Sequence, residues 1–324
     1  MHLPHSTHRF LCLSATLILL ILAATGGAAA YLLDYALKPG DRSRQTDRAW
    51  HEMDSIYPGL RHWRDSLSAR KAWRDTTIKA PDGTALHAYY SARMPHTRRT
   101  ALLIHGYTDC AIRMMHLGRM YERDLNANLL VPDLRNAGAS GGDHFQMGWN
   151  DRLDMKLWLT LVPQLFGDSA QVIVHGVSMG AATAMMLSGD ADVPPIVAGY
   201  IEDCGYTTVD DQFSRELKTQ FGLPRQPLIP IASALCRLRY GWSFGEASAL
   251  RQVAHCGRPM LFIHGTADTY VPTEMVHPLY AAHPGPKQLY LSPGAPHARS
   301  YQCHPSDYSR HVRNFVRRYA GWQI

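Results

Sequence analysis

The sequence GVSMG at residues 176–180 centres on Ser178 and follows an apolar run at residues 172–174. A serine in this setting is typical of a nucleophile on a tight turn from a strand into a helix. Gly176 and Gly180 leave room for that turn. Because a neutral hydroxyl is a poor nucleophile, it needs a base and a group that orients the base. We therefore expect a histidine and a carboxylate beside Ser178.

Two later apolar runs each end in a loop that carries one of these groups. The run at residues 260–264 is followed by Asp268, and the run at residues 288–291 is followed by His297. The carboxyl ends of parallel strands meet at one edge of a sheet, so both side chains are expected to lie near Ser178. In this interpretation His297 accepts the serine proton, and Asp268 fixes the imidazole tautomer and stabilises its charged form.

An oxyanion hole is expected from backbone amides close to the nucleophile. The N–H of Met179 opens the following helix, whose N-terminus favours developing negative charge. The second donor is expected in the loop after residues 102–104, where His105, Gly106 and Tyr107 follow one another. Gly106 lets the backbone turn close to the site, and the Tyr107 N–H is the predicted donor. We expect His105 to be structural, with a hydrogen bond inside the loop.

The elements that position these residues are short apolar runs that alternate with segments of helix length. The predicted strands cover residues 76–80, 85–92, 101–105, 129–132, 171–175, 197–201, 260–264 and 288–291. The first two flank the turn Pro81-Asp82-Gly83, which favours a hairpin. Helical segments at residues 112–125, 151–165 and 305–319 supply crossovers. The pattern predicts the α/β class, with an eight-stranded, mostly parallel sheet and helices on both faces.

A segment at about residues 206–246 interrupts this alternation. Three prolines, at positions 224, 227 and 230, separate two stretches of helical character. An insertion of this length after a strand is more often a lid than a plain connection, so it predicts a small helical cap. Its apolar residues either cover a substrate pocket or pack the cap onto the body, and the pattern favours neither.

The N-terminal segment at residues 11–33 holds no charged side chain and is long enough to span a bilayer. One interpretation is an uncleaved signal-anchor at residues 1–33. The other is a signal peptide cleaved near residues 28–30, which would leave a secreted or periplasmic protein. We favour the single-pass anchor because the apolar run continues beyond the usual end of a signal sequence, and we expect an extracytoplasmic catalytic domain at residues 76–324 behind a helical linker at residues 34–75.

The composition narrows the classes of function. With 324 residues, of which 46% are hydrophobic and 19% charged, the chain is not a disordered protein. The 33 Lys and Arg against 27 Asp and Glu give a surplus too modest to predict a nucleic-acid partner. The six cysteines form no CxxC pair, and neither HExxH nor a phosphate-binding glycine loop occurs. We therefore predict no metal and no organic cofactor.

Five short motifs together resemble the α/β-hydrolase superfamily, in particular bacterial hydrolases of the serine-aminopeptidase-like or Bem46-like type. They are HGY at 105–107, DLRNAGAS at 133–140, GVSMG at 176–180, HGTADTYVP at 264–272 and GAPH at 294–297. The resemblance spans residues 76–324. It implies an α/β-hydrolase fold, a triad of Ser178, Asp268 and His297, and a small cap. Asp203 occupies a place where some relatives carry the acid, and it is the weaker candidate.

Three classes of function follow, and the preferred one is a serine hydrolase of carboxylic esters that works through an acyl-enzyme. A thioesterase would use the same residues. The second class is an aminopeptidase, which needs an anion to hold the substrate ammonium group, and Asp210, Asp211 or Glu216 in the cap could serve. The third is a non-catalytic, membrane-tethered binding protein, which an intact triad disfavours. The expected substrate is a small acyl ester or a short peptide.

Overall fold

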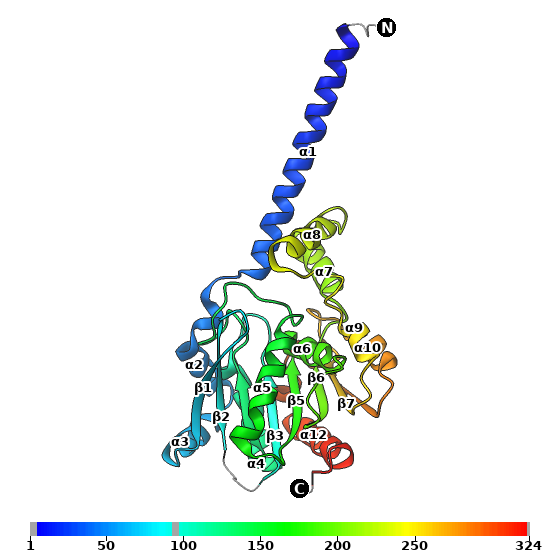
Figure 1. Ribbon diagram of the computed structural model, residues 1–324. Helices are drawn as coiled ribbons and strands as arrows, with labels where there is room; N and C mark the ends of the chain where they lie inside the picture. Colours follow the sequence, from blue (N-terminus) through cyan, green and yellow to red (C-terminus); the bar gives the residue numbers. More distant parts are fainter. Residues whose placement is uncertain (1–4, 93–96, 323–324) are drawn as a thin grey trace.

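The computed structural model describes residues 5–92 and 97–322, and a mixed eight-stranded sheet forms its centre (Figure 1). The strand order is β1-β2-β4-β3-β5-β6-β7-β8. The pairs β1–β2 and β2–β4 are antiparallel, and all other pairs are parallel. The strands are β1 (Trp73–Lys79), β2 (Ala85–Ser91), β3 (Arg99–Ile104), β4 (Asn128–Pro132), β5 (Gln171–Val177), β6 (Val197–Asp203), β7 (Met260–Gly265) and β8 (Lys287–Ser292).

Helices cover both faces of the sheet, and successive strand residues point alternately into the two layers. In β3, Leu102 and Ile104 belong to one apolar core, whereas Ala101 and Leu103 belong to the other. The first core also contains α5 (Asp151–Phe166), α6 (Met179–Ser188), α9 (Ala249–Val253) and α10 (Val276–Ala282). The second contains α2 (Thr46–Ile56), α3 (Leu60–Ala69), α4 (Met115–Leu125) and α12 (Pro305–Tyr319). Short helical turns lie at η1 (Asp41–Arg44), η2 (Ala111–Met114), η3 (Thr273–Met275) and α11 (Ser300–Cys303).

The eight-stranded, mostly parallel sheet that the sequence predicts is confirmed, and its antiparallel start is confirmed with it. The main difference lies in β1, which begins at Trp73 rather than at residue 76. This strand is an edge strand whose residues are all exposed or half-buried, so its beginning carries no continuous apolar run. The predicted linker at residues 34–75 therefore contains the beginning of β1.

A single long helix, α1 (His5–Leu37), precedes the body and projects away from it (Figure 1). Its segment Leu13–Leu37 is long and apolar enough to cross a membrane. The last turns are different from the rest, because Ala29, Leu33 and Leu37 are fully buried at a spacing of four residues. This stripe packs beside α8 (Leu228–Tyr240) in the cap. The helix therefore ends inside the folded body, four residues beyond the predicted segment.

The insertion between β6 and β7 forms the helical cap that the sequence predicts, with α7 (Val209–Phe221) followed by α8. The side chain of Thr208 caps α7 by accepting a hydrogen bond from the Asp211 N–H at 2.9 Å. Gly222 and Gly241, with φ of +66° and +78°, end the two helices in the left-handed conformation. The cap lies at the end of the body from which α1 projects (Figure 1).

Candidate active site

Ser178 stands on the turn between β5 and α6, with φ of 57° and ψ of −117°. A positive φ is strained for a residue with a side chain, and such strain persists only where the surroundings enforce it. Here the Ser178 N–H donates to the Asp203 carbonyl at 2.8 Å. A Cβ on Gly176 would lie 2.0 Å from the Gly180 carbonyl oxygen, and one on Gly180 would lie 2.0 Å from that of Ile104. Both glycines are therefore sterically required by the turn.

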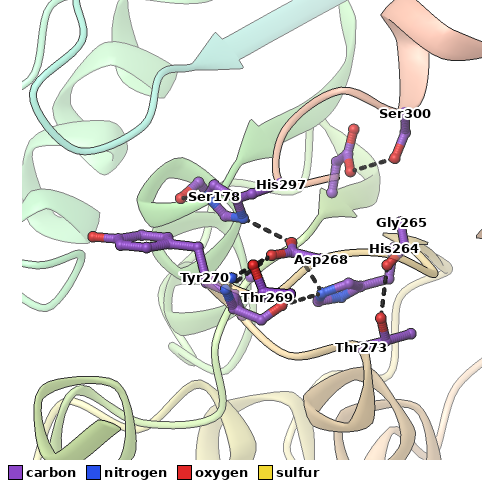
Figure 2. A network of polar contacts seen from close by, with 12 residues as sticks. Ser178, His264, Gly265, Asp268, Thr269, Tyr270, Thr273, His297 and Ser300 are labelled. Atoms are coloured by element: carbon purple, nitrogen blue, oxygen red, sulfur yellow. Dashed lines mark hydrogen bonds and ion pairs between the residues drawn. The ribbon is translucent and has the colours of Figure 1, made fainter. Parts of the chain in front are cut away.

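The structure brings the three predicted catalytic side chains together (Figure 2). Nε2 of His297 lies 2.8 Å from the Ser178 Oγ, and its Nδ1 lies 2.7 Å from Oδ2 of Asp268. Because an ionised carboxylate only accepts hydrogen bonds, Nδ1 carries the proton and Nε2 is free to accept the serine proton. This is the tautomer that a general base next to a serine needs.

Asp268 follows β7 and is buried, yet it is well supplied with donors. Its Oδ1 accepts the backbone N–H groups of Tyr270 and Val271, each at 3.0 Å. Burial raises the pKa of this carboxyl, but the hydrogen bonds from His264 and His297 outweigh burial and bring the pKa to about 2. Asp268 therefore stays ionised at every pH near neutrality.

Asp203, the weaker candidate for the acid, has other partners. Its Oδ2 accepts the Tyr308 hydroxyl at 3.0 Å, and its Oδ1 accepts the Ser300 hydroxyl at 3.4 Å. The Tyr308 hydroxyl is also 2.9 Å from Nε2 of the buried His175. Burial raises the pKa of Asp203 to about 6. Asp268 is thus the carboxylate that is hydrogen-bonded to His297. Asp203 belongs instead to a buried network with Tyr308, Ser300 and His175.

The backbone of the loop after β3 lies directly against the nucleophile. A Cβ on Gly106 would lie 3.4 Å from the Cβ of Ser178, so the Tyr107 amide that follows is next to the site. His105 is fully buried inside this loop, where its Nδ1 donates to the Gly106 carbonyl at 2.8 Å and its Nε2 accepts the Leu134 N–H at 2.9 Å. The structural role predicted for His105 is confirmed. Met179 is the first residue of α6, where the N–H groups of the first turn have no acceptor within the helix. The oxyanion roles of Met179 and Tyr107 stay predictions.

A cavity of about 460 Å³ adjoins the triad, and most of its wall is apolar. Tyr107 and Tyr270 belong to this wall and also adjoin the triad. The Tyr270 ring lies 4.9 Å from the His297 ring, and Tyr107 follows Gly106. Ser178 and His297 do not line the cavity themselves. The remaining wall comes from both cap helices and from the end of α1.

Three features of the site go beyond the residues that the sequence analysis assigned. His264, at the end of β7, has its Nε2 3.4 Å from Oδ2 of Asp268 and donates to the Val271 carbonyl at 2.9 Å. Tyr270 covers His297, and α1 contributes to the cavity wall. His264 and Tyr270 both fall within the motif HGTADTYVP, so position within that motif is a signal for them. No local pattern points to the contribution of α1.

Among the described residues, one group of three side chains has the spacing of metal ligands, namely Cys204, Asp268 and His297. Two of these are hydrogen-bonded to each other, and His297 also contacts Ser178. Burial raises the pKa of the Cys204 thiol well above its usual value, whereas a metal ligand must be a thiolate. Asp268 and His297 therefore fit a hydrogen-bonded relay with Ser178 better than a set of metal ligands that includes Cys204.

The strand order and the turn at Ser178 are those of the α/β-hydrolase fold. Solved structures with this fold superpose on the chain. The esterase Pf2001 of Pyrococcus furiosus superposes with a TM-score of 0.61 at 22% identity, over 76% of this chain and 92% of that one. Est1E of Butyrivibrio proteoclasticus, solved with ferulic acid bound, superposes with a TM-score of 0.57 at 18% identity, over 76% and 99% of the two chains. At these identities the likeness establishes the fold.

Sequence comparison then gives the particular family. The uncharacterized protein YqkD of Bacillus subtilis (strain 168) is 32% identical over 240 residues, which are 74% of this chain and 77% of that protein. The chain belongs to the same family as YqkD. The uncharacterized protein YfhR of Escherichia coli O157:H7 is 25% identical over 263 residues, or 78% and 84% of the two chains. No protein-family model matches the chain.

Proposed function

We propose that this protein is a serine hydrolase that cleaves carboxylic esters through an acyl-enzyme on Ser178. The observation that carries the proposal is the relay from Ser178 Oγ to His297 Nε2 at 2.8 Å and from His297 Nδ1 to Asp268 at 2.7 Å. It stands on a strained nucleophile turn with two sterically required glycines. The esterases among the structures with the same fold support the reaction class.

In the proposed mechanism Ser178 Oγ attacks the ester carbonyl carbon while its proton moves to Nε2 of His297. The negative charge on the carbonyl oxygen is stabilised by the amides of Tyr107 and Met179. The intermediate collapses when His297 returns the proton to the departing alcohol. Water, deprotonated by the same imidazole, then attacks the acyl carbon, and the acid leaves as Ser178 regains its proton. Throughout, Asp268 stays ionised and stabilises the imidazolium.

A fluorophosphonate probe tests this proposal directly, because it phosphonylates only an activated serine. We expect the wild-type protein to be labelled, the Ser178→Ala variant to show no labelling, and the same variant to lose hydrolysis of p-nitrophenyl acetate. A wild-type protein of native melting temperature that is not labelled would contradict the proposal and favour a binding protein with an inactive site.

A second candidate function, an aminopeptidase, is favoured by one residue of the cap. Glu216 lines the cavity, and it accepts hydrogen bonds from the amides of Gln212 at 3.4 Å and Gln220 at 2.6 Å. Among the described residues no cation forms an ion pair with it. In contrast, Asp210 pairs with Arg225 at 2.9 Å, and Asp211 lies at the start of α7. Of the three acidic residues considered for an ammonium group, Glu216 is the one in the cavity.

The comparison of ester and amide substrates separates the two functions. We expect faster turnover of p-nitrophenyl acyl esters than of aminoacyl naphthylamides, because the cavity wall is mainly apolar. The Glu216→Gln variant keeps the shape of the side chain and removes its charge. A peptidase would lose amide turnover in this variant, whereas an esterase for uncharged substrates would keep or gain ester turnover. Faster turnover of amides by the wild type would contradict our assignment.

The N-terminal helix suggests a location for the enzyme. We propose that residues 1–33 act as an uncleaved, single-pass anchor, that residues 34–75 connect it to a catalytic domain at residues 76–324, and that this domain lies outside the cytoplasm. Cleavage near residues 28–30 would need an accessible backbone, yet Ala29 is fully buried within a helix. A mass measurement of the protein from the membrane fraction tests the anchor, because cleavage would remove about 30 residues.

A further inference from the structure

The last turns of α1 line the cavity and also continue the apolar helix that is long enough to cross a membrane. Leu32, Leu33 and Ala36 line the cavity next to the triad, together with Leu228 and Ile229 of the cap. The same helix is exposed on all sides further toward its N-terminus, where Leu17, Leu19 and Leu20 are each about 60% exposed or more. The helix therefore runs without a break from a stretch suited to lipid into the wall of the cavity.

Helix geometry gives the depth at which the cavity lies. A bilayer core of about 30 Å is spanned by about 20 helical residues. If the uncharged run that begins at residue 11 fills the core, residue 30 reaches the boundary, and Leu32, Leu33 and Ala36 lie at the membrane surface. Tyr31 and Tyr35, which stack with centroids 6.4 Å apart, fall where aromatic side chains are enriched in membrane proteins.

The cap carries a second, independent sign of membrane contact. Leu238 on α8 is 82% exposed, and Phe221 and Leu223 at the end of α7 are about 40% exposed. Leu238 and Phe221 belong to the two cap helices, Leu223 follows α7, and α8 packs beside the end of α1. The whole cap lies at that end of the body (Figure 1). A cap that touches the bilayer would cover this apolar surface, which water would otherwise have to solvate.

The end of α1 is also hydrogen-bonded to the loop after β3, which carries Tyr107, and to the loop after β4, which carries Phe145. The Tyr107 hydroxyl donates to the Ala36 carbonyl at 2.6 Å, and the Phe145 N–H donates to the Leu37 carbonyl at 2.8 Å. These are among the last carbonyls of a helix, which have no partner within the helix itself. The membrane helix is thus held in place against the loop that supplies a predicted oxyanion donor.

We infer that the substrate is an acyl ester of a membrane lipid, and that its acyl chain enters the cavity from the bilayer alongside α1. This inference rests on the proposed ester hydrolysis and adds the substrate class and its route. An apolar cavity of about 460 Å³, bounded by the anchor and the cap, takes up the chain. The ester group then lies past Tyr107 and Tyr270, at Ser178.

The experiment uses the full chain reconstituted in phosphatidylcholine vesicles. One probe is 4-methylumbelliferyl palmitate dissolved in the same vesicles, and the other is water-soluble 4-methylumbelliferyl acetate. Ala36→Phe places a larger side chain in the cavity wall, and we expect it to lower the ratio of palmitate to acetate turnover at least tenfold. Ala28→Phe makes the same change at an exposed position two turns earlier, and its ratio should stay within twofold of the wild type.

Leu32→Trp, at a second cavity position, repeats the test if Ala36→Phe does not fold. An unchanged ratio in a folded cavity variant that still hydrolyses acetate would overturn the inference and leave the proposed hydrolase intact. Equal effects of the Ala28 and Ala36 substitutions would also overturn it, since they would indicate a general effect of the helix. Absence of both fluorophosphonate labelling and acetate hydrolysis in the wild type would instead contradict the proposed function itself.

Discussion

The carboxyl edge of the sheet and the cavity region, which the cap and the end of α1 form, differ in how closely their atoms are constrained. At the edge, the glycines around Ser178 meet backbone atoms, and the relay consists of hydrogen bonds of 2.7 and 2.8 Å. In the cap, Gly245 has open space where a Cβ would lie. The turn at Ser178 therefore tolerates almost no added atom, whereas the cap has room for a side chain at Gly245. Such a division lets one reaction be kept while the substrate varies.

The largest effect is expected from Asp268→Asn, which tests whether the relay at the edge is catalytic. An amide cannot stabilise the imidazolium and favours the wrong tautomer, so we expect kcat for p-nitrophenyl acetate to fall about 10³- to 10⁴-fold. Asp203→Asn is the matched control, because Asp203 is equally buried but bonds to Tyr308 and Ser300. It should lower kcat less than tenfold. A larger loss in the Asp203 variant would reverse the assignment of the acid.

The next prediction compares glycines of the two regions in thermal unfolding. In Gly180→Ala the new Cβ would lie 2.0 Å from the Ile104 carbonyl oxygen, and backbone on both sides must shift. We expect a loss of about 3 kcal/mol in the free energy of unfolding, at the upper end for overpacking, together with weaker fluorophosphonate labelling. Gly245→Ala in the cap meets no atom within 4 Å and should change stability by less than about 0.5 kcal/mol. Equal losses would show that the edge is no tighter than the cap.

The same contrast explains what could be predicted from the sequence. The edge is encoded locally: the central strands β3 to β7 are continuous apolar runs, and Ser178, Asp268 and His297 each lie within five residues after a strand end. Their meeting follows from the parallel sheet alone. The strand whose beginning could not be predicted is β1, because its exposed and half-buried residues from Trp73 form no apolar run.

The cavity could not be predicted in this way, because it is made by contacts between segments far apart in the chain. The Tyr107 hydroxyl reaches the Ala36 carbonyl across 71 positions, and Tyr35 reaches Gln220 across 185. A carbonyl at a helix end carries no residue-specific signal, and an apolar helix has the same composition in lipid as against a protein. The sequence analysis accordingly left two roles open for the apolar residues of the cap.

A third prediction uses pH to compare buried and exposed carboxylates. Burial raises the pKa of Glu202, at the end of β6, to about 8. Its folded pKa lies above its unfolded value of about 4.3, so stability is highest below that value and falls as the pH rises toward 8. In Glu202→Gln the loss of stability between pH 5 and pH 8, followed by thermal unfolding, should be smaller than in the wild type.

Glu246 in the cap is the control, because its pKa is shifted in the opposite direction. A hydrogen bond from Arg237 lowers the pKa of Glu246 to about 2. Stability from this pair is present above the unfolded pKa and disappears only as the pH falls through the folded value. Between pH 5 and pH 8, the stability of Glu246→Gln should therefore change with pH as much as that of the wild type. If the stability of Glu202→Gln also changed as much as that of the wild type, Glu202 would not be a source of this pH dependence.

The smallest effect is expected where the two regions join, at the hydrogen bond between the Tyr107 hydroxyl and the Ala36 carbonyl. Tyr107→Phe keeps the backbone amide and removes one neutral hydrogen bond, which contributes about 1 kcal/mol. If α1 holds the oxyanion loop in position, part of this energy is lost in the transition state, and kcat should fall about two- to fivefold. Tyr206→Phe also removes a hydroxyl bond to a backbone carbonyl, that of Met147 at 2.9 Å, but this carbonyl belongs to the segment between β4 and α5 and not to α1. It should lower stability by a similar amount and leave kcat within twofold. Equal kcat in the two variants would mean that α1 shapes the cavity without acting on the catalytic loop.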